Sequence, residues 1–241
     1  MSMQKVPITK TVKVNIVWMP AALLLSGIGV FTGCAAGSAV PVPTSTPAPS
    51  RQYEPNYRDA LGEGRQWTKF ALRYRVNLVA GQDSDARFQT ALASWQPYFS
   101  EFFTFTPATG SDFDIEVESV PADSLGGDTI GSTTVTFQRS NRKIVKAKIL
   151  VDGGLSDELL SQVLAHELGH ALGLDGHSPE VSDVMFARAH LPLAITERDR
   201  NTLFAVYADK LASSGRAEPQ PIRSSDLVTT AVCQFHREAR R

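Results

Sequence analysis

The residues of this chain best suited to chemistry form one short stretch, His166-Glu-Leu-Gly-His170. Residues four apart lie one above the other on the same face of a helix. His166 and His170 can therefore direct ring nitrogens at a common centre and supply two ligands of a tetrahedral zinc ion. Glu167 lies about 100° further around the helix, so its carboxylate can reach a water at the metal without ligating the metal. The pattern H-E-x-x-H is typical of zinc-dependent hydrolases.

The residues after this stretch separate a metal site from a chance pattern on a surface helix. Gly173 is placed to end the helix and let the chain turn back, and a third histidine, His177, follows. The segment Ser182–Phe186 then brings a methionine, Met185, eight residues after His177. An ordinary amphipathic helix with its polar residues in water has no need of this succession. The predicted ligands of one catalytic zinc are His166, His170 and His177.

Length and composition limit the number of domains, the partners and the disulfide bonds that this chain can have. With 241 residues, the chain has room for one domain of about 150 to 200 residues plus appendages. Hydrophobic residues make up 42% and charged residues 20%, which is ordinary for a globular protein. The net charge of −1 gives no electrostatic reason to expect a nucleic-acid partner or a polybasic membrane surface. The only two cysteines, Cys34 and Cys233, exclude a disulfide framework larger than one bond.

The front of the chain has the features of an export signal. Several lysines precede Ile16–Phe31, which is uncharged, too short for a membrane span of about 20 residues and suited to a signal peptide. A small residue before Cys34 resembles a bacterial lipoprotein processing site, so we expect a signal peptide over 1–34 and a lipid anchor at Cys34. The alternatives are a secretory signal cut nearby, for example after Ala36, or an uncleaved anchor. The protein is predicted to be an exported cell-envelope lipoprotein, or otherwise secreted or periplasmic.

Three further segments follow the signal. Residues 35–56 are rich in proline, serine and threonine and are predicted to be an extended linker. Residues 57–211 are expected to form a single folded domain. Residues 212–241 are polar and arginine-rich and are predicted to be a disordered tail, with a short helix over 226–237 as a conceivable exception.

The folded segment alternates between patterns typical of strands and of helices. We expect an α+β domain, with one mixed twisted sheet and a helix that carries the first two metal ligands. Ser156 is a plausible N-cap for that helix, and Asp157 and Glu158 suit its first turn. The predicted strands are Phe70–Val79, Asp114–Val120, Thr133–Phe137 and Ile144–Val151. The predicted helices run from Asp83 or Ser84 to Phe103, from Ser156 to Leu172, and from Thr196 to Leu211.

The motifs resemble those of a known family. The segment 166–178, followed by 182–186, resembles the zinc signature and methionine turn of metzincin peptidases, with the matrixins as the nearest branch. Segments 176–186 and 195–207 are particularly similar to a group of bacterial, matrixin-like predicted zinc proteases. This resemblance implies a metzincin-like domain with a C-terminal helix and a methionine turn, in which Met185 lies beneath the metal as a packing floor and not as a ligand. It also implies a zinc-dependent endopeptidase that acts on protein or peptide substrates.

The chain departs from the metzincin pattern at the third ligand. Gly176 stands where the family has its third histidine, and His177 comes one residue later. The interval from His177 to Met185 nevertheless matches the matrixins, which favours His177 as the ligand. The competing candidates are Asp175, His190 and Glu197.

The resemblance also bears on other metals and on latency. No histidine precedes His166, so the second, structural zinc of animal matrixins is not expected. Calcium in the Gly126–Asp128 or Asp152–Gly154 loop is left open, although such glycine-rich turns are more often plain turns. The zinc-binding cysteine of the matrixin inhibitory segment is also missing, since Cys34 lies in the signal region. Any latency must therefore have another basis.

We predict hydrolysis of peptide bonds with Glu167 as the general base. The strand before the zinc helix, or Thr133–Phe137, can offer an edge on which an extended substrate pairs. We expect residues 186–194 to build the pocket beside the zinc. Two rival hypotheses are an exported zinc hydrolase of a non-protein amide, and a non-catalytic zinc-binding envelope protein. The presence of Glu167 argues against the second rival, because a structural zinc site has no use for a general base.

Overall fold

A computed structural model describes residues 57, 64–79, 84–99, 103–189, 194–212 and 227–237 of the chain. All of them belong to a compact unit that spans Pro49–Arg241. The predicted signal peptide, the anchor at Cys34, the linker and His190 lie outside the described residues. Within these ranges no helix is both long and apolar enough to cross a membrane.

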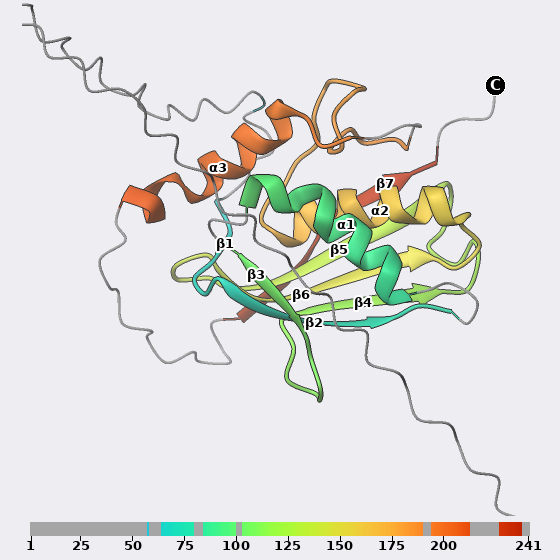
Figure 1. Cartoon of the computed structure of the whole chain (residues 1–241), viewed down its shortest axis with the longest axis horizontal. Helices are drawn as coiled ribbons and strands as arrows, with labels where there is room; N and C mark the ends of the chain where they lie inside the picture. The colour runs from blue at the N-terminus through green and yellow to red at the C-terminus, as the bar shows by residue number, and fades with distance from the viewer. Residues whose placement is uncertain are drawn as a thin grey trace, which may run out of the picture. The chain divides into compact units, whose positions relative to one another are not determined.

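The described strands form one mixed sheet (Figure 1). Its order is β3-β2-β4-β6-β5-β7, with the short β1 paired to β6. The pairs from β3 to β6 are parallel, whereas β5 runs antiparallel to both of its neighbours. The strands are β1 (Gln66–Trp67), β2 (Ala71–Asn77), β3 (Thr104–Pro107), β4 (Ile115–Val120), β5 (Thr129–Gln138), β6 (Lys143–Asp152) and β7 (Leu227–His236).

Two helices, α1 (Ser84–Phe99) and α2 (Asp157–Ala171), pack against each other beside the sheet (Figure 1). Helix α2 lies over β5, β6 and β7, whereas α1 contacts β2. The third helix, α3 (Glu197–Ala212), follows the irregular segment after α2. The core between these layers is apolar and aromatic, and burying it supplies the main favourable free energy of folding. Its largest fully buried side chains include Trp67, Trp95, Tyr207, Phe88 and Phe235.

The α+β class, the mixed sheet and the three helices are confirmed. Helices α2 and α3 begin and end within one residue of the predicted bounds. Helix α1 stops at Phe99, earlier than predicted. Phe103 packs its ring edge-on against Tyr207 of α3, at 5.2 Å between centroids, instead of continuing α1. Strands β1 and β3 were not predicted.

The prediction for the end of the chain is wrong over residues 227–237. The structure places a ten-residue strand, β7, where a disordered tail or a short helix over 226–237 was expected. Valine and threonine predominate in Leu227–Thr230, and β-branched residues favour strands because they pack well on a pleated surface. The outer edge of β5 gives this segment backbone partners along its length. Residues 213–226 lie outside the described part of the chain.

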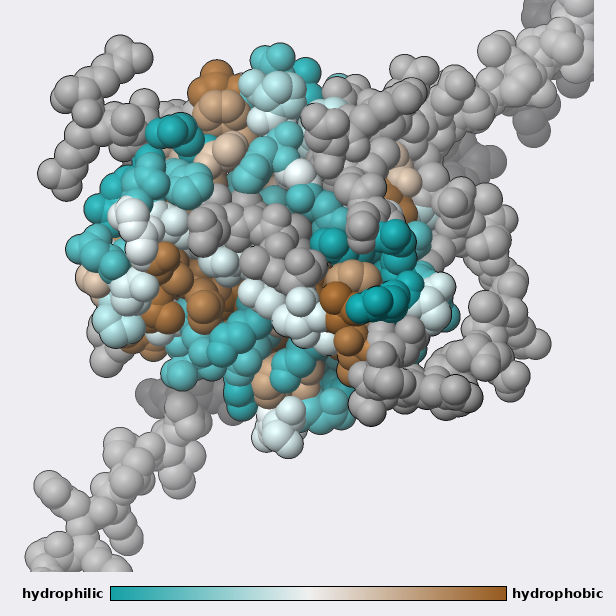
Figure 2. All heavy atoms as spheres, turned by 180° about the vertical axis from the view of Figure 1, so that it is seen from behind, coloured by the Kyte–Doolittle hydropathy of each residue, from teal (hydrophilic) through white to brown (hydrophobic). Residues whose placement is uncertain are grey.

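The surface of the described residues exposes few large apolar side chains. Phe70, Val79, Val181 and Leu227 are the exposed ones. Figure 2 shows small apolar areas interrupted by polar ones on the face opposite to that of Figure 1. Apolar residues scattered in this way are normal on a soluble domain and indicate no particular function.

Candidate metal centre

Helix α2 carries the first two metal-binding candidates, and local sequence explains where it starts. The Ser156 hydroxyl accepts a hydrogen bond from the backbone N–H of Leu159, as an N-cap does. Asp157 and Glu158 follow in the first turn, where negative charge favours the helix dipole. From Val163 to Ala171 every residue is buried, so the helix presents its histidines inside the molecule and not to solvent.

The imidazoles of His166 and His170 are both fully buried and face each other. Their Nε2 atoms are 3.1 Å apart. The opposite nitrogen of each ring meets a backbone carbonyl: Nδ1 of His166 lies 2.6 Å from the oxygen of Val184, and Nδ1 of His170 contacts the oxygen of Leu174. A carbonyl only accepts, so each Nδ1 carries the proton and each Nε2 presents a lone pair to the shared centre.

His177 completes the cluster. Its ring centroid lies 5.3 Å from those of His166 and His170. One ring nitrogen from each of the three histidines lies within 4.8 Å of the others. Among the described residues this is the one group of three or more histidine, cysteine or acidic side chains able to hold a metal ion.

The competing ligands are engaged elsewhere or lie outside the described part. Asp175 is bound to Arg65 at 3.1 Å. Glu197 is exposed and pairs with Arg200 on α3. The loops considered for calcium form no metal-binding group: Asp152 accepts the backbone N–H of Gly154 and of Asp123, and Asp128 pairs with His236.

The donor set fits zinc. Two lone pairs facing each other at 3.1 Å repel unless a cation lies between them, and tetrahedral zinc with bonds of about 2.0 to 2.1 Å sets its nitrogens about 3.3 Å apart. Metal ligation also needs neutral imidazoles. Burial, aided by the neighbouring histidines, lowers the pKa of His170 to about 3 and that of His177 to about 4. Burial lowers the pKa of His166 as well.

Glu167 lies beside this cluster, fully buried under strand β5. The Thr133 hydroxyl donates to its Oε2 at 2.5 Å. Its Oε1 has no hydrogen-bond partner, and Gly131 of β5 lies so close that a Cβ there would stand 2.6 Å from this oxygen. Burial raises the pKa of Glu167 to about 8, although the Thr133 hydrogen bond acts in the opposite direction. A carboxylate with one free oxygen and a raised pKa is suited to exchanging protons near neutral pH.

Two glycines allow the chain to wrap around the histidines. Gly173 has φ of 110°, and a Cβ there would meet the Arg65 carbonyl oxygen at 2.5 Å. Only glycine fits this left-handed position. The turn that it makes carries the Leu174 carbonyl back to His170. Gly169 lies directly against the sulfur of Met185, so the methionine is buried against α2 on the turn of the helix between His166 and His170.

A buried carboxylate on α3 holds the methionine turn in place. Asp199 accepts the backbone N–H groups of Val184 at 3.0 Å, Met185 at 3.3 Å and Thr196 at 2.8 Å. It also accepts the hydroxyl of Tyr57 at 3.1 Å. Because the Val184 carbonyl bonds to His166, Asp199 fixes the residue that orients a metal-binding ring. Burial raises the pKa of Asp199, whereas the backbone hydrogen bonds lower it.

Two tryptophans fix α2 from outside the site. The indole N–H of Trp95 donates to the Ala165 carbonyl at 2.9 Å, and that of Trp67 donates to the Ala171 carbonyl at 2.8 Å. Both rings are fully buried. These hydrogen bonds hold α2 at the residue before His166 and at the residue after His170.

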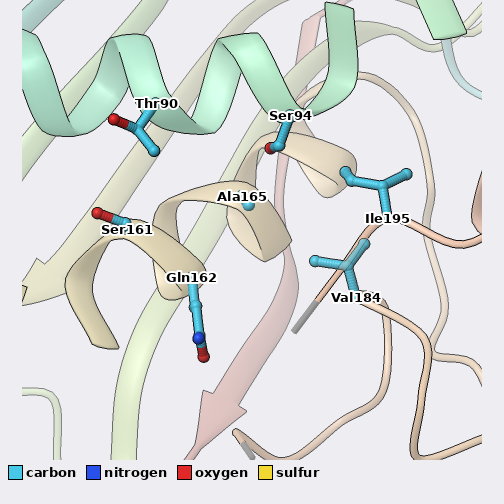
Figure 3. A pocket seen from close by; sticks show the side chains of 7 residues that line it. All are labelled: Thr90, Ser94, Ser161, Gln162, Ala165, Val184 and Ile195. Atoms are coloured by element: carbon cyan, nitrogen blue, oxygen red, sulfur yellow. The ribbon is translucent and has the colours of Figure 1, made fainter. Parts of the chain in front are cut away.

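The hollow between α1 and α2 is a packing gap and not part of the metal centre. Figure 3 shows Thr90 and Ser94 on α1 facing Ser161, Gln162 and Ala165 on α2. The hydroxyls of Thr90, Ser94 and Ser161 each donate to a carbonyl of their own helix. They therefore have no proton left to offer a ligand.

The three histidines, predicted as ligands from the sequence, lie together in the structure, with Glu167 on the same helix as two of them and Met185 packed against that helix. Three other residues of the centre were not predicted for these roles: Thr133, which binds Glu167; Asp199, which holds the methionine turn; and Phe235 of β7. The Phe235 ring stacks on that of His166, with centroids 3.9 Å apart and planes at 20°. Thr133 and Asp199 carry no local signal of these contacts, whereas the β-branched run before Phe235 could have indicated a strand.

Three neutral histidines, two on helix α2 and one on the segment that follows it, lie with a buried glutamate near a methionine turn and define a zinc metallopeptidase centre. A sequence profile of the Matrixin peptidase family matches residues 66–208, and the chain belongs to this family. It is a zinc-dependent endopeptidase. A search among curated proteins found no match.

Proposed function

We propose that this chain hydrolyses peptide bonds of proteins outside the cytoplasm, with His166, His170 and His177 as zinc ligands and Glu167 as the general base. The observation that carries the proposal is the pair of Nε2 atoms 3.1 Å apart beside the unpartnered Oε1 of Glu167. Zinc, when bound, supplies a Lewis acid that polarises a carbonyl group and lowers the pKa of a water.

The chain's own residues then handle the proton and the geometry. Glu167 accepts a proton from the attacking water on its Oε1 and delivers it to the leaving amine. Thr133 holds the other carboxylate oxygen, so Oε1 stays directed at the reacting atoms. The carbonyls of Val184 and Leu174 keep the two imidazoles in the tautomer that leaves Nε2 free for the metal.

An extended peptide is the substrate form that this site accommodates best. Strand β5 carries Gly131 and Thr133, the two residues that contact Glu167. A peptide paired with the side of β5 away from β6, which β7 occupies in this structure, would run past the general base, with main-chain hydrogen bonds giving affinity. Ala187 and Ala189 bond through their backbones to His236 of β7, on the side away from β5. This supports the expectation that residues 186–194 build the pocket beside the zinc.

The export features motivate the cellular part of the proposal. We propose that Cys34 becomes lipidated and anchors the protein in the cell envelope, with secretion or periplasmic release as the alternative. Labelling cells with a radioactive fatty acid tests this. The full chain should incorporate label and fractionate with membranes, whereas Cys34→Ser should do neither. An unlabelled full chain would exclude the anchor.

The catalytic assignment is tested with the full chain carrying Phe235→Ala, which removes the ring stacked on His166, together with an unfolded protein substrate and a chelator. We expect zinc-dependent cleavage, restored by adding zinc after chelation. Glu167→Gln should keep zinc, measured by metal analysis, and lose at least about 10²-fold in kcat, the scale of a general base. A Glu167→Gln protein that holds zinc and cleaves normally would refute Glu167 as the base. Zinc binding with no cleavage of any protein would favour the non-catalytic or non-protein alternatives.

A further inference from the structure

Strand β7 lies on the side of β5 where a peptide substrate would pair. It runs antiparallel to β5 along almost the whole of that strand, from Leu227 opposite Gln138 to His236 opposite Thr129. Without β7, β5 would be the exposed edge of the sheet beside the zinc helix. The main-chain groups that β7 uses on β5 are therefore the ones that a peptide would need.

The register sets the end of β7 at the reacting atoms. Phe235 lies opposite Gly131, where a Cβ would stand 2.6 Å from Oε1 of Glu167. The Phe235 side chain is fully buried, and its ring stacks face-on upon His166 at 3.9 Å. An aromatic ring thus covers one face of a proposed zinc ligand, from a strand position opposite the glycine that lies close to the general base.

A second backbone contact holds β7 from the other side. The N–H of His236 donates to the Ala187 carbonyl at 3.3 Å, and the N–H of Ala189 donates to the His236 carbonyl at 2.8 Å. The next residue, Arg237, donates its N–H to the Asp128 carbonyl at 2.7 Å. The end of β7 is therefore held by backbone hydrogen bonds on both sides, from β5 and from the segment 187–189. This is the space between the two segments, called here the peptide groove, in which a substrate would lie.

We propose that β7 is an intramolecular, substrate-like occupant of the peptide groove, which keeps the enzyme latent until the strand leaves. The inference rests on the proposed function, because it names the regulation of that same site. It also assigns a preference: the pocket beside His166 accepts an aromatic side chain, as it accepts that of Phe235. A strand that only completed the sheet would need its pairing with β5. It would not need the Phe235 ring stacked on His166, nor the backbone hydrogen bonds of His236 to Ala187 and Ala189.

The first test uses the zinc-loaded full chain and a fluorescent peptide that copies residues 227–237. Phe235→Ala removes the stacked ring and should bind this peptide at least about tenfold more tightly than the parent chain, since loss of a buried ring weakens the internal competitor. The matched control is Leu227→Ala, at the exposed, distant end of β7, which should bind like the parent. A peptide in which alanine replaces the residue copied from Phe235 should bind more weakly. Equal binding by the parent and Phe235→Ala would overturn the proposal.

The second test locks β7 and does not depend on tolerance of Phe235→Ala. Thr136 of β5 and Thr229 of β7 are register partners whose hydroxyl oxygens are 2.9 Å apart, far from the histidines along the strand. Thr136→Cys/Thr229→Cys, with Cys34→Ser and Cys233→Ser, can be oxidised to a cross-strand disulfide and reduced again. We expect the oxidised form to bind no labelled peptide and the reduced form to bind it, with cleavage following the same order.

The two readouts separate this inference from the proposed function. Peptide binding that is equal in the oxidised and reduced forms overturns the occupant role of β7, whether or not either form is active. Peptide binding that appears only on reduction, but without cleavage of any peptide, supports the occupant and counts against the catalytic assignment. Zinc content is measured in every sample so that loss of metal is not read as latency.

Discussion

Asp199 offers the sharpest test of how the methionine turn supports the metal centre. Asp199→Ala removes the acceptor for the backbone N–H groups of Val184, Met185 and Thr196. Val184 and Met185 are buried, and each buried donor left without a partner costs about 1 to 3 kcal/mol. Partial replacement by water or a shift of the turn reduces the sum. We therefore expect a loss of about 3 kcal/mol in the free energy of unfolding.

Asp199→Ala should also lower the affinity for zinc. Val184 loses its tether, and its carbonyl no longer holds Nδ1 of His166 in place. Loss of such an outer hydrogen-bond partner weakens metal affinity by about 10- to 100-fold. Denaturant unfolding of the chelated chain gives the stability change, and competition with a chelating dye gives the zinc affinity. Asp199→Asn keeps one acceptor oxygen and should fall between the parent and Asp199→Ala in both measurements.

The control is Glu197→Ala, two residues earlier on the exposed side of α3, which should change stability by less than about 0.5 kcal/mol. A stability loss in Asp199→Ala with unchanged zinc affinity would refute the reasoning. Asp199 would then join α3 to the turn without orienting the metal ligand.

Three further changes have direct consequences. Gly131→Ala sets a Cβ 2.6 Å from Oε1 of Glu167 and should lower kcat by about 10²-fold with zinc retained; Gly110→Ala, where nothing lies within 4 Å, is the control for kinetics and metal content. Gly169→Ala pushes into the Met185 sulfur and should cost about 1 to 3 kcal/mol in denaturant unfolding. In the chelated chain the raised pKa of Glu167 contributes stability below pH 4.5 that is lost as the pH rises towards about 8. Glu167→Gln should remove that pH-dependent loss of stability, which amounts to on the order of 5 kcal/mol at pH 9.

Each of these outcomes can fail in a recognisable way. Normal turnover in Gly131→Ala would mean that β5 is free to move away from the general base. An unchanged unfolding curve in Gly169→Ala would show that the methionine is not packed tightly under the helix. A pH profile of unfolding identical in the parent and Glu167→Gln chains would show that the glutamate is solvated once zinc is removed.

The parts of the site that could be predicted depend on residue types and spacing within a short stretch of the sequence. The positions of His166 and His170 follow from the helical repeat, and Gly173 and Met185 follow within a few residues. The helix cap at Ser156 is equally local. All of these depend on neighbours along the chain, so a single sequence contains the signal.

The parts that could not be predicted depend on contacts between distant segments. Thr133 reaches Glu167 from another strand, and Asp199 reaches the methionine turn from the next helix. Strand β1 has only two residues and shows no periodicity, and β3 is short and ends at Pro107. Strand β7 had β-branched residues in its favour, yet its polar surroundings resembled a tail. Its partner, the edge of β5, exists only in the folded sheet.

The hydrogen bonds from two tryptophan indoles to helix α2 make intrinsic fluorescence a probe of this helix. Trp67 and Trp95 are two of its three tryptophans, and their N–H groups bond to the carbonyls of Ala171 and Ala165. Any loosening of α2 that opens the metal centre must break or stretch these bonds and admit water to two dry rings. Intrinsic fluorescence can thus follow the loss and return of the metal-binding helix in unlabelled protein, in real time and at low concentration.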